Sequence, residues 1–260
     1  FHGGTLAGTA PTGQEKVKKG FEPMVPGFRH VPYNDLEAMR QALSPATAAI
    51  LIEGIQGEGG VTLATPEYLL GLRQLCDEKK LLLLMDGVQC GHFRTGQFQS
   101  YQRILEHTSS NSRPHDAGST FLPDGISMAK SLGGGFPIGA FWVRDKYADL
   151  LGAGTHGTTF GGNPLGCAVA LRILEVIQGE KLAGNALRTG EFLKTELCQV
   201  AQKYPQAVKS IRGLGFMLGL ELWEKEKIPA LATGEKSAAI QFVNRLHDAG
   251  LMSIPSGNQE

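Results

Sequence analysis

The feature that most constrains the fold of this chain is a strand–helix–strand pattern between residues 48 and 85. Residues 48–52 form a short apolar run, which is typical of a buried parallel strand. Pro66 then opens a predicted helix that runs to about residue 78, with leucines along one face. Residues 81–85 are a second apolar run. Because a helix that joins two parallel strands makes a right-handed crossover, the pattern predicts an α/β fold with a mostly parallel sheet and helices on both faces.

The rest of the chain predicts further strands, longer helices and a second domain. Strands are expected at residues 126–129, 138–143, 208–211, 216–222 and 251–254, and helices at residues 164–177, 182–204 and 237–249. The polar segment 107–119 is expected to be an exposed loop. We therefore predict a large domain over residues 1–178 and part of a smaller C-terminal domain over residues 179–260.

The composition narrows the class of protein and of partner. The 25 basic and 25 acidic residues leave no net charge, so we expect neither nucleic acid nor a membrane as partner. Four widely spaced cysteines and no secretory signal predict reduced thiols in a cytoplasmic protein. The seven histidines lack the spacing of ligands, so no metal site is predicted. The chain opens without a methionine and stops abruptly, and we expect both ends to be cut.

Lys130 lies between an apolar run and the glycine-rich turn at residues 133–135. A protonated lysine cannot attack a carbonyl group, but a lysine that forms an imine can hold an aldehyde cofactor. The flexible backbone beside this lysine would let a bulky cofactor approach closely. The alternative is a surface lysine with a helix beyond it. The pattern favours a cofactor site.

Asp86 ends the apolar run of residues 81–85. In open α/β sheets, ligands bind in the crevice beyond the carboxyl ends of the strands. Val88 and Gln89 follow on the same loop, where they could press on a ring face and bond a ring hydroxyl. The alternative is an aspartate that caps a helix. An imine-forming lysine, together with an acid that keeps a ring nitrogen protonated, is the minimal equipment for pyridoxal 5'-phosphate (PLP) chemistry.

Several motifs in the expected order resemble those of the class III aminotransferases. They are residues 1–5, 27–35, 53–60, 86–89 and 154–164, so the resemblance runs almost end to end. The chain is most similar to the acetylornithine/succinyldiaminopimelate and ornithine aminotransferase branch. The resemblance implies fold type I of the PLP-dependent transferases, with pyridoxal 5'-phosphate as cofactor.

The resemblance also implies a role for each matching residue around the cofactor. Lys130 would be the Schiff-base lysine and would carry the proton during transfer. Asp86 would pair with the pyridinium nitrogen, next to Gly87 on the same loop. Val88 would pack on one ring face and Gln89 would hold the ring hydroxyl.

The remaining implied roles concern the other ring face, the phosphate and the substrate. Phe1 would stack on the opposite face of the ring. Thr159 would reach the phosphate from the neighbouring subunit, which implies a homodimer with shared active sites, and Thr158 would contact the substrate. The alternative for these two threonines is a pair in a strand. Glu58 would gate substrate entry by pairing with an arginine that follows residue 260 in the family.

The chain also departs from the family pattern at three glycines. Gly4 replaces an arginine that grips the substrate carboxylate, and we expect weaker substrate binding. Gly54 replaces a proline and is expected to remove a rigid turn, whereas Gly87 replaces a glutamate and removes a charge beside the cofactor. The loop that supplies further phosphate contacts in the family would precede residue 1.

Two functions follow from these matches and departures. The first is a transaminase of arginine biosynthesis, which moves the distal amino group of N2-acetylornithine or a related ω-amino acid to 2-oxoglutarate. The reaction would run as two half-reactions through a pyridoxamine form, and would therefore show ping-pong kinetics. The second is a divergent relative that binds the cofactor or only dimerises, with weak or no transaminase activity.

Overall fold

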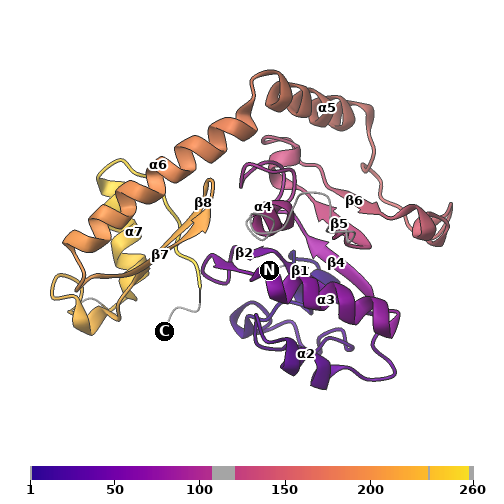
Figure 1. The fold of residues 1–260 in the computed structure, drawn as a ribbon, viewed down its shortest axis with the longest axis horizontal. Coiled ribbons are helices and arrows are strands. Elements are labelled where there is room, and N and C mark those ends of the chain that lie inside the picture. The colour runs from indigo at the N-terminus through magenta and orange to yellow at the C-terminus, as the bar shows by residue number, and fades with distance from the viewer. Residues whose placement is uncertain (1, 107–120, 234, 258–260) are drawn as a thin grey trace.

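The computed structural model describes residues 2–106, 121–233 and 235–257 (Figure 1). The strands are β1 (Ala49–Glu53), β2 (Ile55–Gln56), β3 (Thr62–Leu63), β4 (Leu82–Asp86), β5 (Gly125–Met128), β6 (Ala140–Val143), β7 (Val208–Leu214) and β8 (Met217–Leu222). The helices are α1 (Leu6–Thr9), α2 (Leu36–Ala42), α3 (Pro66–Lys79), α4 (Ser100–Glu106), α5 (Pro164–Gly179), α6 (Leu182–Lys203) and α7 (Ala238–Asp248). Short 3-10 turns occur at η1 (Glu15–Val17), η3 (Lys130–Leu132), η4 (Asp145–Leu151) and η5 (Lys225–Lys227). The predicted exposed loop at residues 107–119 lies outside the described residues.

The main sheet has the strand order β1-β4-β5-β6. β1 pairs with β4 and β4 pairs with β5 in parallel, whereas β6 runs antiparallel to β5 at the edge. The register places Glu53 opposite Asp86, and Asp86 opposite Ser127. The predicted α/β class with a mostly parallel sheet is therefore confirmed, and the carboxyl ends of β1, β4 and β5 meet at one edge.

Helix α3 is the crossover that joins β1 to β4, by way of the small β2–β3 hairpin. The side chain of Thr65 accepts a hydrogen bond from the backbone N–H of Tyr68 (3.2 Å), and Pro66 occupies the first turn. The helix ends at Lys80, whose φ of 57° is left-handed. These signals explain why the predicted start at Pro66 is correct and the end lies one residue further on.

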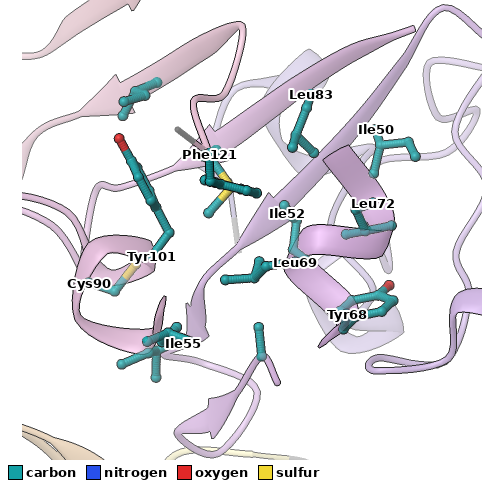
Figure 2. Close-up of a cluster of buried hydrophobic side chains, with 14 of the residues drawn as sticks. Ile50, Ile52, Ile55, Tyr68, Leu69, Leu72, Leu83, Cys90, Tyr101 and Phe121 are labelled. Atoms are coloured by element: carbon teal, nitrogen blue, oxygen red, sulfur yellow. The ribbon is translucent and has the colours of Figure 1, made fainter. Parts of the chain in front are cut away.

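The core lies between α3 and the strands β1 and β4 (Figure 2). Leu69 and Leu72 of α3 are fully buried, as is Leu83 of β4. Each fully buried leucine contributes roughly 1.5–3 kcal/mol relative to an exposed one. Ile50 and Ile52 of β1 complete the contact from the neighbouring strand. This packing holds β4, and with it Asp86, in the middle of the sheet.

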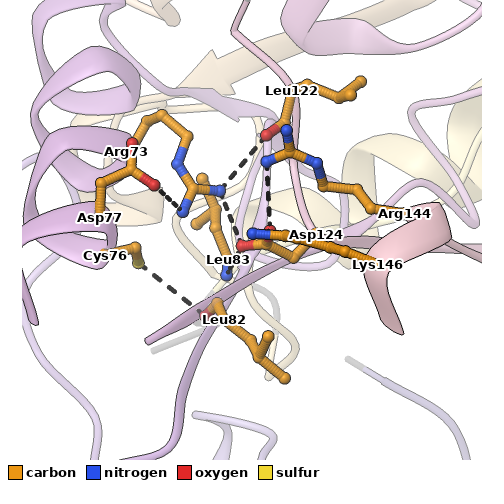
Figure 3. Close-up of polar contacts among 9 residues, drawn as sticks. All are labelled: Arg73, Cys76, Asp77, Leu82, Leu83, Leu122, Asp124, Arg144 and Lys146. Atoms are coloured by element: carbon orange, nitrogen blue, oxygen red, sulfur yellow. Dashed lines mark hydrogen bonds and ion pairs between the residues drawn. The ribbon is translucent and has the colours of Figure 1, made fainter. Parts of the chain in front are cut away.

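A buried charge network ties α3 to the loop before β5 (Figure 3). The carboxylate of Asp124 is 1% exposed and accepts hydrogen bonds from Arg73 Nη1 (2.8 Å) and from the backbone N–H of Leu83 (2.9 Å). Arg144 and Lys146 lie 3.4 and 3.6 Å from its second oxygen. Burial by itself would raise the pKa of Asp124, but the bonds from Leu83 and Arg73 lower it below its ordinary value.

The C-terminal part of the described chain is built on helix α6, which leads from α5 to the β7–β8 hairpin and α7 (Figure 1). The helices predicted at residues 164–177, 182–204 and 237–249 are all present, as are both strands of the hairpin. The predicted domain boundary lies where α5 ends at Gly179, and the division into two domains stays a prediction. None of the helices in the described ranges is long and apolar enough to cross a membrane.

The predicted strand at residues 251–254 is wrong, because this segment is neither strand nor helix. Its apolar side chains do not form the buried face of a sheet, since Met252 is 91% and Ile254 71% exposed. The carbonyl oxygen of Ser253 instead lies 2.7 Å from Nε2 of His247, at the end of α7. Helices α1, α2 and α4 were not predicted, because they are too short to show a clear apolar period.

The Asp124 network predicts a large cost for removing its central charge. We expect Asp124→Asn to lower the free energy of unfolding by about 3–5 kcal/mol, because Arg73 would keep a buried charge with only the exposed Asp77 as its partner. The matched control is Asp77→Asn, which removes the other carboxylate on Arg73 (2.8 Å) but is 62% exposed, and should cost about 1 kcal/mol or less. Urea unfolding measures both, and equal losses would contradict the prediction.

The same network predicts an acid dependence of stability. Because the pKa of Asp124 is lower in the folded chain than in the unfolded chain, its contribution is complete above about pH 4 and is lost as the pH falls through the folded pKa. The free energy of unfolding of the wild-type protein should therefore fall more steeply below that pH than the value for Asp124→Asn. Parallel acid titration curves would show that the carboxylate does not act in this way.

Candidate active site

The candidate site lies at the edge where the parallel strands end. Asp86 is the last residue of β4, and its register partner on β5 is Ser127. Lys130 follows β5 after Ala129 alone, because the strand ends at Met128. Two predicted site residues thus follow adjacent parallel strands at the same end, which is where ligands bind in open α/β sheets.

Asp86 is buried and well bonded, with 5% of its surface exposed. His2 Nδ1 donates to Oδ2 at 2.6 Å, whereas the backbone N–H of Val88 (3.0 Å) and the hydroxyl of Ser127 (3.3 Å) donate to Oδ1. Burial alone would raise the pKa of Asp86, but the bonds from His2 and Val88 lower it below its ordinary value. The carboxylate is therefore held ionised at neutral pH.

Lys130 is exposed and opens the 3-10 turn η3, in front of Gly133–Gly135. Its φ of 49° is left-handed, a conformation that costs a residue with a side chain roughly 1–2 kcal/mol. Such strain gathers at functional sites, where the surrounding structure maintains it. The glycine-rich turn behind it also uses positive φ values, 53° at Gly134 and 116° at Gly135.

Gln89 and Glu58 lie on the side of the site that faces the C-terminal part of the chain. Both are half-buried and line an open crevice of about 1110 Å³ between the residue 57–61 loop, β8 and α7. Neither Asp86 nor Lys130 is among its described lining residues. Gly57 approaches the amide of Gln89 so closely that a side chain at this position would overlap it.

The loop that carries Glu58 is held at both of its ends. The carboxylate of Glu53 accepts a hydrogen bond from the backbone N–H of Gly57 (3.0 Å). The backbone carbonyl of Glu58 accepts bonds from Gln14 Nε2 (2.9 Å) and from the N–H of Gly257 (2.9 Å). The crevice side of the site is therefore fixed by segments from both ends of the described chain.

Among the described residues, Thr158, Thr159 and Gly4 make no hydrogen bond to the carboxylate of Asp86. Thr158 and Thr159 are exposed in the segment between η4 and α5, and the hydrogen bonds of the described residues do not link them to Asp86, Gln89 or Lys130. Gly4 is exposed, with open space where a side chain would stand. Gly87 is buried on the loop of Asp86. Phe1 lies outside the described residues.

His2 is a site residue that the sequence analysis missed. It lies in the first motif, between Phe1 and Gly3, where the pattern of residues predicts no role for it. Its contact with Asp86 joins residues 84 positions apart, and the only available signal was a ring nitrogen next to a residue expected at the cofactor. Ser127 was missed for a similar reason, because a serine inside a strand has many possible partners.

Comparisons with known proteins identify the family to which this chain is similar. A family profile described as "Aminotransferase class-III" matches residues 1–260. The acetylornithine aminotransferase of Myxococcus xanthus is 40% identical over 260 residues, which is 100% of this chain and 58% of that protein. The acetylornithine aminotransferase of Gloeobacter violaceus is 44% identical over 257 residues, 99% of this chain and 57% of that protein. The chain thus spans a little more than half the length of these curated relatives.

Solved structures of the same kind share the fold. An ornithine aminotransferase from Toxoplasma gondii superposes with a TM-score of 0.83 and 34% identity, covering 99% of this chain and 56% of that chain. A second structure from Toxoplasma gondii (TM-score 0.82, 33% identity, 100% and 55% covered) is described with PLP partly occupying its active site. The acetylornithine aminotransferase of Elizabethkingia anophelis gives a TM-score of 0.75 at 30% identity, covering 93% and 55%. This chain belongs to the class III aminotransferase family.

Proposed function

We propose that the protein is a PLP-dependent transaminase that moves the distal amino group of N2-acetylornithine, or of a related ω-amino acid, to 2-oxoglutarate in arginine biosynthesis. The observation that carries this proposal is the ionised, buried carboxylate of Asp86 at the same sheet edge as Lys130. The names of the curated relatives support acetylornithine as the amino donor.

The residues present at the sheet edge fit the cofactor. A carboxylate offers about four lone-pair sites to donors, and described groups occupy three of those on Asp86. One site therefore stays free for the protonated ring nitrogen of PLP. Lys130 is exposed, so its amine is accessible to the cofactor.

Each residue of the candidate site then has a defined role. PLP, when bound, supplies an electron sink for the carbon that loses its proton. Lys130 holds the cofactor covalently and afterwards moves a proton at its Nζ atom. Asp86 keeps the ring nitrogen protonated by charge proximity, and His2 in turn orients Asp86. Val88 would cover one ring face and Gln89 would hold the ring hydroxyl, and we assign the other ring face to Phe1 by resemblance to the family.

We further propose that two copies of the chain form a homodimer with shared sites. Thr159 would reach the phosphate of the other copy, and Thr158 would contact its substrate. The exposure of both threonines supports this reading, as does the exposed apolar surface beside them. Phe160 is 81% and Leu165 64% exposed, which is unusual for large apolar side chains of a lone subunit.

One observation favours a second function, a relative that binds PLP with little transamination. The first motif has Gly4 where an arginine would hold the substrate carboxylate, and the described chain places no side chain in that space. On this reading Glu58 would still line the crevice without selecting a substrate.

Lys130 provides the direct test of the proposed function. Addition of PLP should give the protein a visible absorption band, which acetylornithine should bleach. After reduction with borohydride, mass spectrometry should find PLP attached to Lys130. Lys130→Ala should remove the trapped adduct and lower transamination by about 10²–10⁴-fold or more, because it removes the proton carrier. Lys79→Ala, on the exposed end of α3, is the control. A band that acetylornithine does not bleach favours the second function, and no band at all removes the cofactor claim.

His2 should control the charge of Asp86 and hence the pH range of cofactor binding. In His2→Phe the ring volume stays but the donor is lost, so the pKa of Asp86 should rise and its ionised fraction in acid should fall. We expect the dissociation constant of PLP to rise by about tenfold at acidic pH and less at neutral pH, in absorbance titrations. Ser127→Ala, which removes a longer bond (3.3 Å), should have a smaller effect. An unchanged pH profile in His2→Phe would show that His2 does not act through Asp86.

A further inference from the structure

Three glycines of the site lie against two polar side chains at the start of α4. A Cβ atom built on Gly87 would overlap Oε1 of Gln99. One built on Gly91 would first overlap the backbone carbonyl oxygen of Gly87, and would also lie 2.8 Å from Oε1 of Gln99. A Cβ atom built on Gly54 would overlap the hydroxyl oxygen of Ser100. Real Cβ atoms essentially never approach other atoms this closely. Gln99 and Ser100 therefore occupy the volume that side chains at these glycines would need.

The two polar residues are almost completely removed from solvent. Gln99 is 2% and Ser100 1% exposed. Among the described residues, Nε2 of Gln99 has no hydrogen-bond partner, and a buried amide in that state is costly. A buried amide without a partner calls for a structural explanation, and we look for it in the residues that pack around Gln99.

Hydrogen bonds connect this pair to the strand end that carries Asp86. The hydroxyl of Ser100 donates to Sγ of Cys90 (3.1 Å), whose thiol donates to the backbone carbonyl of Asp86 (3.4 Å). The 86–91 loop itself is closed by the bond from the N–H of Gly91 to the carbonyl of Gly87 (3.0 Å). Gln99 packs against both of these glycines, on the inner side of the loop.

We propose that Gln99 and Ser100 form a polar wedge that positions the 86–91 loop, and that the glycines at 54 and 87 are fitted to this wedge. The loop carries Asp86, Val88 and Gln89, so the consequence for the cofactor rests on the proposed function. Gly54 and Gly87 then are not simple losses of a turn and a charge. They provide the space in which the wedge stands, and a larger side chain at either position conflicts with it.

A double-mutant cycle on Gly87 and Gln99, made in the full-length protein, tests the wedge. Gly87→Ala should lower Tm by about 4–8 °C, because the added methyl group meets the buried amide. In Gly87→Ala/Gln99→Ala the methyl group gains room, so at least half of that loss should be recovered. Gly179→Ala, which has open space around its Cβ, and the exposed Gln74→Ala serve as controls and should add without coupling.

Two further readouts separate positioning from packing. Gly87→Ala should raise the dissociation constant of PLP by about tenfold and shift the visible band of bound PLP, and Gln99→Ala should reverse both changes in the double variant. If Gly87→Ala does not fold, the pair Gly54→Ala and Ser100→Ala gives the same cycle with a smaller conflict, because a serine hydroxyl can rotate. The Ser100→Ala change should then rescue Gly54→Ala.

Each outcome bears on one claim. Tm losses that simply add in both cycles overturn the wedge, whether or not the protein binds PLP. Coupled Tm losses with unchanged PLP affinity and band position would show packing without positioning, and overturn the proposal. A wild-type protein that shows no PLP band removes the proposed function, while the coupling in Tm still decides whether the wedge exists.

Discussion

Parallel pairing of β4 with both β1 and β5 is the constraint on which the rest of the structure depends. β4 is the only described strand of the main sheet with parallel neighbours on both sides, and its apolar residues Leu83 and Met85 are buried. Because parallel strands end on the same side, this pairing brings Asp86 close to the loop of Lys130. Packing against α3 and the hydrogen bond from the backbone N–H of Leu83 to Asp124 hold the strand in place.

The chemistry of the site depends on the ionisation state of one carboxylate, that of Asp86. Burial alone would favour the neutral form of Asp86, which could not hold a ring nitrogen protonated. Donors at His2 and Val88 reverse that preference, and the hydroxyl of Ser127 donates a third hydrogen bond to the same carboxylate. The fold therefore stabilises an anion where the proposed cofactor needs one.

The glycine departures from the family pattern have different surroundings in the structure. Gly4 stands in open space, consistent with the loss of a substrate contact. Gly54 and Gly87 are closely packed by Ser100 and Gln99, so their small size is used by neighbouring side chains. In the sequence, all three glycines look like simple losses of a side chain. In the structure, Gly54 and Gly87 differ from Gly4, because neighbouring side chains fill the space beside them.

The sequence by itself determined the α/β class, the βαβ crossover and the long helices, because apolar period and capping residues such as Thr65 and Pro66 act locally. It also pointed to Asp86 and Lys130 through their position after strands. Only the tertiary structure decided the contact of His2 with Asp86, the wedge of Gln99 and Ser100 and the fate of residues 251–254. Those features depend on contacts between different segments of the chain, and the local pattern of residues does not specify such contacts.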